Sequence, residues 1–223
     1  MIQKNPNGYR SHSIPQAQLH RLTEYYTKLD ALLKENVVTI KSVELARLMG
    51  MSASSVRADL ATFGEFGKAG HGYDLALLHA SLAEILGINC RFSAVLVGVG
   101  KLGQTIIGSF PFSQYGVRLK GAFDVSPKLI GSEIAGCRVM DAAGQSDFIR
   151  EEGVQIAILC VDKANAQRAA DSLVQSGIQG IWNFTDTNLV ITQPEVVVEN
   201  IHFSNSLLAL TCNLNLSQTE PLI

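Results

Sequence analysis

A glycine-rich hexapeptide at residues 98–103 constrains the fold of this chain more than any other feature of the sequence. It follows an apolar run, 91–97, that is typical of a buried strand, and it opens a helical stretch, 104–108. In this setting the glycine spacing provides a tight turn, room for a pyrophosphate and close packing of helix on strand. The amides at the helix N-terminus favour phosphate. The segment therefore predicts a dinucleotide-binding turn formed by Gly98, Val99, Gly100, Lys101, Leu102 and Gly103.

An acidic residue ends the next predicted strand, 117–124. Asp124 follows Gly103 at roughly the 20-residue interval where an acid accepts hydrogen bonds from the ribose hydroxyls of a dinucleotide. A carboxylate there repels a 2′-phosphate, so we expect NAD(H) rather than NADP(H), although Lys128 nearby opposes this preference. The predicted cofactor site includes Val125 and Lys128 beside Asp124. The alternative interpretation of Asp124 is a solvated acid at a strand end.

The rest of the second half alternates strands and helices. Apolar strands are predicted at 156–161, 180–184 and 196–201, with a helical pattern at 164–175. This alternation favours a doubly wound parallel sheet of the Rossmann type. We expect an α/β protein in which residues 85–202 form this domain.

The first half has the pattern of a helix-turn-helix. A helix over 18–35 is predicted to begin at Ser13-Ile14-Pro15, with Ser13 as its N-cap. Two short helices follow within 39–60, in which Ser42 is expected to cap the first and Ser52 the second. Gly50 is suited to the left-handed conformation that ends a helix. Paired short helices of this kind are typical of DNA-reading proteins, although helical hairpins with other roles share the pattern.

A hairpin is predicted directly after these helices. Residues 63–73 contain four glycines interleaved with aromatic side chains, which favours a short twisted hairpin over the alternative of a flexible linker. A helix-turn-helix followed by a hairpin is a winged helix. We therefore expect residues 1–84 to form an N-terminal winged-helix DNA-binding domain, and the helical segment 74–88 to join the two halves.

Composition restricts how this domain could bind DNA. The net charge is −2, and residues 1–85 hold nine Lys and Arg against eight Asp and Glu. DNA binding would therefore depend on a few placed cations and not on a broad basic face. The four cysteines have no metal-ligand spacing, which predicts reduced thiols in a cytoplasmic protein without a metal. No apolar run is long enough for a membrane span, and no signal peptide is expected.

Together these segments resemble the Rex family of redox-sensing transcriptional repressors, from about residue 13 to residue 215. The matching pieces in the first half are Ser13-Ile14-Pro15, Arg21-Leu22, Tyr25-Tyr26, Val56-Arg57, Asp59-Leu60, Phe63-Gly64 and Gly70-His71-Gly72-Tyr73. Those in the second half are residues 98–103, Ala122-Phe123-Asp124-Val125, Ala157-Ile158-Leu159, Gly177-Ile178 and Gly180-Ile181-Trp182-Asn183-Phe184.

The resemblance implies a function and an assembly. Such proteins are dimers that bind double-stranded operator DNA, and NADH releases the DNA while NAD favours the bound form. A domain-swapped C-terminal helix, here roughly 204–214 within 203–223, packs between the domains of the partner. The implied DNA contacts are Ser52, Ser54, Ser55, Arg57, Lys68 and His71. The implied cofactor contacts add Val161, Asn183 and Phe184 to the glycine turn and the strand-end residues.

The sequence departs from the family at positions that bear on function. Ala58 and Ala69 stand where the family has basic DNA-facing residues, and Asp162 and Asp186 replace prolines. Three switch positions, at which the family has arginine, tyrosine and aspartate, are here Thr27, Ser109 and His202. An alternative is therefore a divergent paralogue that binds a dinucleotide but has lost or altered redox switching or DNA binding. Whether the dimer is homomeric or pairs with a paralogue stays open.

A third alternative, an NAD-dependent dehydrogenase, needs a proton-relay side chain facing the nicotinamide. His202, the single histidine of the second half, lies beside the exchanged helix in this alignment. We therefore expect a regulator and not an enzyme.

Overall fold

The computed structural model describes residues 14–62, 66–68 and 72–218. These residues form two compact units that meet in the chain between Asn89 and Cys90.

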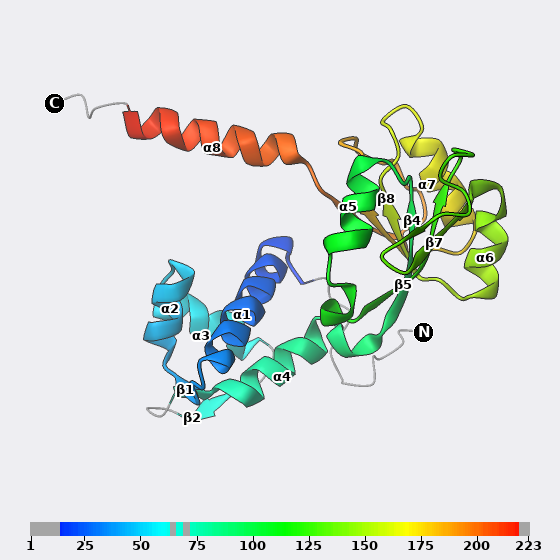
Figure 1. Cartoon of the computed structure of the whole chain (residues 1–223). Coiled ribbons are helices and arrows are strands. Elements are labelled where there is room, and N and C mark those ends of the chain that lie inside the picture. The colour runs from blue at the N-terminus through cyan, green and yellow to red at the C-terminus, as the bar shows by residue number, and fades with distance from the viewer. Residues whose placement is uncertain (1–13, 63–65, 69–71, 219–223) are drawn as a thin grey trace. The chain divides into compact units, whose positions relative to one another are not determined.

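The first unit is a winged helix, as predicted (Figure 1). Its helices are α1 (Gln16–Lys34), α2 (Ser42–Met49), α3 (Ala53–Ala61) and α4 (Leu75–Ile85). Its strands, β1 (Thr39–Ile40), β2 (Gly67–Lys68) and β3 (Gly72–Asp74), form an antiparallel sheet in the order β1-β3-β2. The β2–β3 pair is the predicted hairpin. The sequence did not predict β1, because two residues carry no readable periodicity.

The core of the first unit is built from the predicted helical stripe. Side chains three and four positions apart on α1 are fully buried, which places one face of this helix against α3 and α4. The buried residues of this core are Leu22, Tyr25, Leu29, Ile40, Leu45, Ala46, Val56, Leu60, Leu75, Leu78 and Leu82.

The ends of α2 and α3 confirm two predictions and contradict a third. Gly50 has φ 64° and ends α2, and the Ser52 hydroxyl accepts a hydrogen bond from the Ser55 amide at 3.1 Å. The prediction that Ser42 is the N-cap of α2 is wrong. Lys41 is the N-cap residue, and its backbone amide donates a hydrogen bond to the Glu44 carboxylate at 2.8 Å. Ser13 lies outside the described residues, and Pro15 is the N-cap of α1.

The second unit contains a seven-stranded sheet in the order β10-β9-β8-β4-β5-β7-β6. All pairs are parallel except β6–β7. The strands are β4 (Phe92–Val97), β5 (Val117–Asp124), β6 (Glu133–Ile134), β7 (Cys137–Asp141), β8 (Ile156–Leu159), β9 (Gly180–Asn183) and β10 (Val197–Asn200). The chain starts at β4, adds strands on one side and then crosses to the other, so the sheet is doubly wound as predicted.

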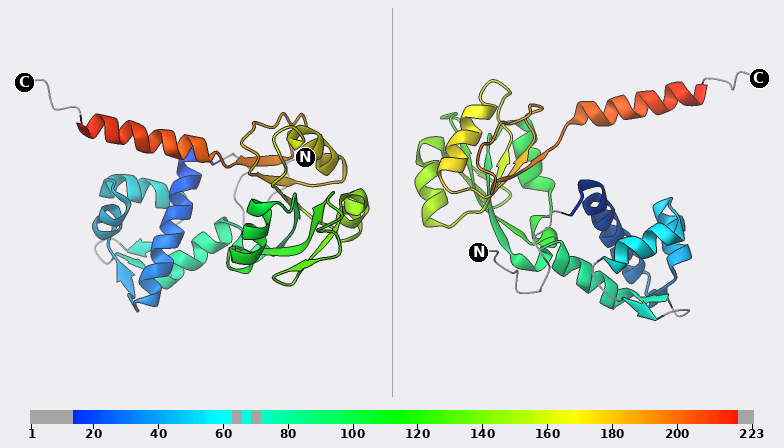
Figure 2. Two further views of the ribbon diagram at one scale, coloured as in Figure 1. Left: turned by 45° about the horizontal axis from the view of Figure 1, so that its top comes forward. Right: turned by 180° about the vertical axis from the view of Figure 1, so that it is seen from behind.

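Helices cover both faces of this sheet (Figure 2). Ala94 and Leu96 of β4 pack with α5 (Lys101–Ser109), whereas Val95 and Val97 pack with α6 (Gln145–Glu151) and α7 (Ala166–Gln175). This alternation follows from the two-residue period of a strand. The 3₁₀ turns are η1 (Ile88–Cys90), η2 (Phe112–Tyr115) and η3 (Ala142–Gly144). Elements β6, β7 and α6 have at most seven residues each, and the sequence did not predict them.

The last helix is α8 (Phe203–Gln218). Every side chain described on it, 203–217, is exposed, although the helix carries no charged residue. Its exposed large apolar side chains are Phe203, Leu207, Leu208, Leu210, Leu214 and Leu216. Among the described residues, no helix combines the length and the apolarity needed to span a bilayer.

Candidate functional site

A cleft of about 550 Å³ opens in the second unit where β4, β5 and β8 end. The order in which strands are added to the sheet reverses between β4 and β8. Ligands of open α/β sheets usually bind at this topological switch point. The cleft is lined by Val97, Gly98, Gly100, Phe123, Asp124, Val125, Ala142, Gln145, Cys160, Val161, Asp162, Asn165, Arg168, Ala169 and Ser172. The predicted glycine turn and the predicted strand-end acid therefore meet at one site.

The three glycines of the turn are required for different reasons. Gly98 has φ +94°, and a β-carbon on it would lie 2.7 Å from the backbone of Cys160. A β-carbon on Gly103 would collide with the carbonyl oxygen of Gly98. Gly100 lines the cleft, and a β-carbon on it would meet nothing within 4 Å. Contacts within the protein therefore require glycine at positions 98 and 103. No such contact requires glycine at position 100, which leaves space suited to a ligand such as a pyrophosphate.

Helix α5 begins beside this space. Gly100 is its N-cap, and Lys101 and Leu102 in the first turn are exposed. The first amides of a helix have no acceptor within the helix and carry positive partial charge, so they can bind phosphate oxygens. The Gln104 side chain donates to the Val99 carbonyl at 3.0 Å and holds the turn against the helix.

Asp124 lies at the end of β5 and lines the cleft. One carboxylate oxygen accepts a hydrogen bond from the Val99 amide at 2.6 Å, and the other accepts from the Ser126 amide at 2.8 Å. Each carboxylate oxygen has a second lone pair, which leaves room for two ribose hydroxyls. Val125 is 80% exposed on the same rim, whereas Lys128 is exposed outside the lining.

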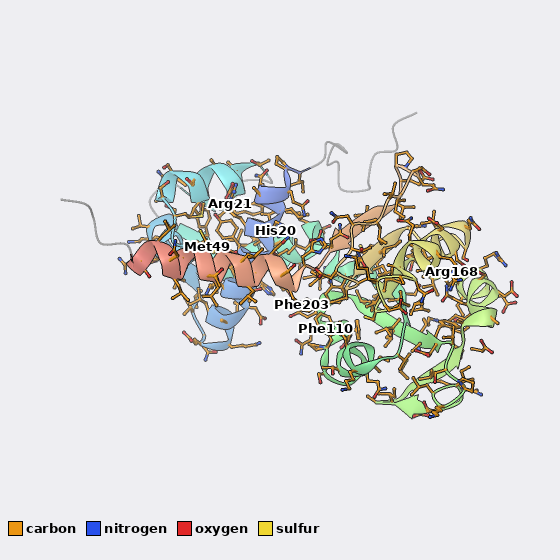
Figure 3. All side chains as sticks on the ribbon, turned by 90° about the horizontal axis from the view of Figure 1, so that it is seen from above. His20, Arg21, Met49, Phe110, Arg168 and Phe203 are labelled. Carbon is orange, nitrogen blue, oxygen red and sulfur yellow. The ribbon has the colours of Figure 1, made fainter. Side chains whose placement is uncertain are left out.

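A chain of hydrogen bonds forms the opposite rim. The Asp162 carboxylate accepts from the Asn165 backbone amide at 3.1 Å and from the Asn165 side chain at 2.8 and 3.0 Å. These hydrogen bonds lower the pKa of Asp162. Arg168, labelled in Figure 3, donates to the Asn165 side-chain oxygen at 2.7 Å. Sequence reasoning did not identify Asn165 or Arg168, although their three-residue spacing after Asp162 marks one face of the following helix.

Cys160 also lines the cleft, next to Val161. Burial raises the pKa of this thiol to about 12, so it stays neutral near pH 7. Among the described residues, no group of three or more His, Cys, Asp or Glu side chains is placed to hold a metal ion.

Asn183 and Phe184 do not line the cleft. The Asn183 amide is 1% exposed, donates to the Thr187 carbonyl and the Asn200 side chain, and accepts from Thr185. Phe184 packs edge-to-face on Trp182, with ring centroids 4.6 Å apart. Their contact with a cofactor stays a prediction.

Three of the predicted DNA-contacting residues lie on α3 of the first unit, and Ser52 is its N-cap. Ser54, Ser55 and Arg57 are exposed on this helix, and the Ser52 hydroxyl lies 2.8 Å from those of both Ser54 and Ser55. Arg57 donates to the Ser42 hydroxyl at 3.1 Å, so its guanidinium lies near the start of α2. Ala58 is exposed beside it. The Lys68 side chain and residues Ala69 and His71 lie outside the described part of the chain.

The three predicted switch positions have separate environments. Thr27 is exposed on α1 and lines a hollow of about 460 Å³ with Thr23, Glu24, Lys28, Leu48 and Met49. Ser109 ends α5 and is exposed. His202 precedes α8, and its ring nitrogens lie 3.3 Å from an Asp186 carboxylate oxygen and 3.1 Å from the Asn188 side-chain oxygen.

Comparison with known proteins covers both units. A family model described as "CoA binding domain" matches residues 91–187, and one described as "Putative DNA-binding protein N-terminus" matches residues 13–61. Similar curated proteins are called "Redox-sensing transcriptional repressor Rex". The Clostridium botulinum protein is 40% identical over 203 residues, covering 91% of this chain and 96% of the relative. The Thermoanaerobacter sp. protein is 41% identical over 202 residues, covering 91% and 90%.

Solved structures give the same result. The Rex-family repressor RSP in complex with beta-NAD+ and operator DNA is 40% identical, with a TM-score of 0.88 over 93% of this chain and 95% of that chain. RSP in complex with beta-NADH is 38% identical, with a TM-score of 0.85 over 92% and 96%. Because identity of 40% to curated members extends over 91% of its length, the chain belongs to the Rex family of redox-sensing transcriptional repressors.

Proposed function

We propose that this protein is a redox-sensing repressor that binds operator DNA as a dimer and is released by NADH as the NADH/NAD ratio rises. The observation that carries the proposal is the position of Gly100, which leaves open space beside the first turn of α5 and within the cleft that Asp124 lines. The same chain carries a winged helix. Its relatives are called repressors and not dehydrogenases, which agrees with the expectation of a regulator.

The cleft suits NAD(H) in one orientation. The pyrophosphate would lie over Gly100 and the first amides of α5, and the adenosine ribose would bind Asp124. Val99, Lys101, Leu102 and Val125 would line this half. The nicotinamide would extend along the rim that Val161 begins, toward Asn183 and Phe184. RSP, which binds both forms of the cofactor in its crystal structures, supports this assignment.

The winged helix would bind the operator through α3. Arg57 is the proposed groove contact, and Ser52, Ser54, Ser55, Lys68 and His71 are proposed to contact the DNA around it. Hydroxyls and amides at the start of a helix are typical phosphate ligands, whereas an arginine can read a guanine edge. The exposure of Ser54, Ser55 and Arg57 on one helix supports the assignment.

We propose a homodimer in which α8 is exchanged between subunits, with residues 1–84, 85–202 and 203–223 as the DNA-binding, cofactor-binding and exchanged segments. The support is the surface of α8, which exposes Leu207, Leu208 and Leu210 on different sides and carries no charge. Large apolar side chains exposed on several sides of one helix are normally covered by a partner surface. The cytoplasm, where operator DNA and the NAD(H) pool meet, is the proposed compartment.

A titration of operator binding tests the proposal. The probe is a labelled duplex taken from the RSP complex or selected by the protein from a random-sequence library. Binding is measured by fluorescence anisotropy without cofactor, with NAD and with NADH. We expect tight binding with NAD and release by NADH. Binding of no selected duplex, or equal binding with both cofactors, would contradict the proposed function.

A further inference from the structure

A buried polar network joins α1 to α3 within the winged-helix unit. Arg21, labelled in Figure 3, donates two hydrogen bonds to the Asp59 carboxylate, at 2.7 and 2.8 Å. The Tyr25 hydroxyl lies 3.1 Å from the same carboxylate and 3.2 Å from the sulfur of Met51. Met51 lies in the turn before α3, so the network holds this helix both near its start and in its second half.

The network is buried at the Asp59 end. Asp59 is 6% exposed and Tyr25 is 0% exposed. A charge in this position is tolerated only with a matched partner, which the bidentate Arg21 guanidinium provides. Its neighbours on the inner face of α3, Val56 and Leu60, are apolar and fully packed. Apolar residues in place of both Arg21 and Asp59 could also fill this part of the core, so packing alone does not require an ion pair here.

The network anchors the helix that carries Arg57, the proposed DNA contact. Asp59 follows Arg57 by two positions, and side chains two apart on a helix point ~200° away from each other. Asp59 therefore faces the core while Arg57 faces outward. Packing of apolar side chains tolerates small rotations of a helix about its axis, whereas a two-bond ion pair between planar groups has one preferred geometry. Fixing Asp59 fixes the direction in which Arg57 leaves α3.

We infer that Arg21, Tyr25 and Asp59 are positioning residues that set the rotation of α3 for sequence-specific DNA reading. The inference rests on the proposed function, since it assigns the orientation of the helix that reads the operator. Non-specific binding depends on phosphate contacts, which tolerate small shifts of the protein. Loss of the network should therefore reduce discrimination between sequences more than it reduces affinity for DNA in general.

The test replaces the ion pair with apolar residues of similar size, Arg21→Met with Asp59→Leu. Such replacements often leave stability unchanged or increase it, because the cost of desolvating two charges disappears. We expect the double variant to stay folded and to keep its NADH affinity. Its thermal midpoint should fall only slightly, because the buried Tyr25 hydroxyl loses its carboxylate acceptor but keeps the Met51 sulfur. We expect its affinity for the operator duplex to fall about tenfold or more, while its affinity for a scrambled duplex of equal length stays within about twofold.

The matched control is Arg150→Met with Asp147→Leu, an exposed ion pair of 2.6 Å on α6 of the other unit. This control should bind both duplexes like the wild type. Tyr25→Phe removes only the hydroxyl and should also lower the ratio of operator to scrambled affinity. This variant decides the question if the double variant does not fold. An unchanged ratio of operator to scrambled affinity in the folded variants would overturn the inference. Failure of the wild type to bind any selected duplex would instead refute the proposed function.

Discussion

The Asp124 carboxylate accepts a hydrogen bond from the Val99 amide at 2.6 Å, so the residue proposed to bind the ribose also holds the glycine turn. Substitutions at Asp124 should therefore have two separable effects. The alanine variant loses both, whereas asparagine keeps an oxygen that can accept from Val99 but carries no charge.

Asp124→Ala should weaken NADH binding by about ten- to a hundredfold, because hydrogen bonds to a charged acceptor contribute ~1.5–3 kcal/mol. Asp124→Asn should lose less affinity but accept NADP(H) more readily, because the charge that repels the 2′-phosphate is gone. Isothermal titration calorimetry with all four dinucleotides measures both effects. Tighter binding of NADP(H) than NAD(H) by the wild type would contradict the assignment.

Gly100→Ala should abolish or strongly reduce NAD(H) binding and leave the fold intact, because the new methyl group meets no protein atom within 4 Å but occupies the space proposed for the pyrophosphate. Gly108→Ala in the same helix is the control, since its methyl group also meets nothing within 4 Å. That control should stabilise the protein by ~0.5–1 kcal/mol and bind NADH normally. Calorimetry and thermal unfolding separate the two results, and normal NADH binding by Gly100→Ala would refute the proposed path of the pyrophosphate.

Arg57→Ala should remove specific operator binding, because a well-placed arginine contributes ~1–3 kcal/mol of base discrimination and the neighbouring Ala58 cannot replace it. Arg118→Ala removes one positive charge from an exposed site on β5 of the other unit and is the control for net charge. Ser42→Ala, which frees the Arg57 guanidinium from its partner at 3.1 Å, should change operator affinity only slightly. Anisotropy with operator and scrambled duplexes provides the measurement, and retention of operator affinity by Arg57→Ala would exclude this contact.

NADH should release DNA less completely here than from relatives that retain the arginine, tyrosine and aspartate of the family. A ligand shifts an equilibrium only by its differential affinity for the two states. Thr27 and His202, which stand at the arginine and aspartate positions, cannot form the ion pair that supplies part of this difference. The triple variant Thr27→Arg, Ser109→Tyr, His202→Asp should release DNA at lower NADH concentration. If the wild type already releases DNA sharply and the triple variant does no better, the switch is not weakened.

The stability of the winged-helix unit should fall in acid through Asp59. The Arg21 guanidinium, with help from the Tyr25 hydroxyl, lowers the pKa of Asp59 in the folded state. Stability from this shift is present above the unfolded value of about 3.9 and is lost as pH falls through the folded pKa. Urea unfolding at a series of pH values should show a smaller acid loss for Asp59→Asn, which is also less stable near pH 7. Equal acid dependence in both proteins would show that the pair is not coupled to folding.

Local patterns in the sequence determined much of this protein. The glycine spacing of 98–103 after an apolar run predicted the turn, because a tight turn, a close approach and a helix start each require a residue type at a fixed position. Gly50 and Ser52 marked the turn before α3 for the same reason, since helix ends are satisfied by neighbours in sequence. The apolar stripe of α1 predicted its buried face.

Only the tertiary structure decided which polar residues face inward and which elements complete the sheets. The helical period puts Asp59 on the same face of α3 as Val56, but it does not identify the partner of the carboxylate, because Arg21 lies 38 positions earlier. Strand β1 has only two residues, too few to carry a period, and it forms by pairing with β3, which is distant in the chain. The buried Asn183 amide donates to Asn200 on β10, a partner 17 positions later that the fold brings beside it. Such pairings depend on contacts across the chain, which side-chain periodicity does not encode.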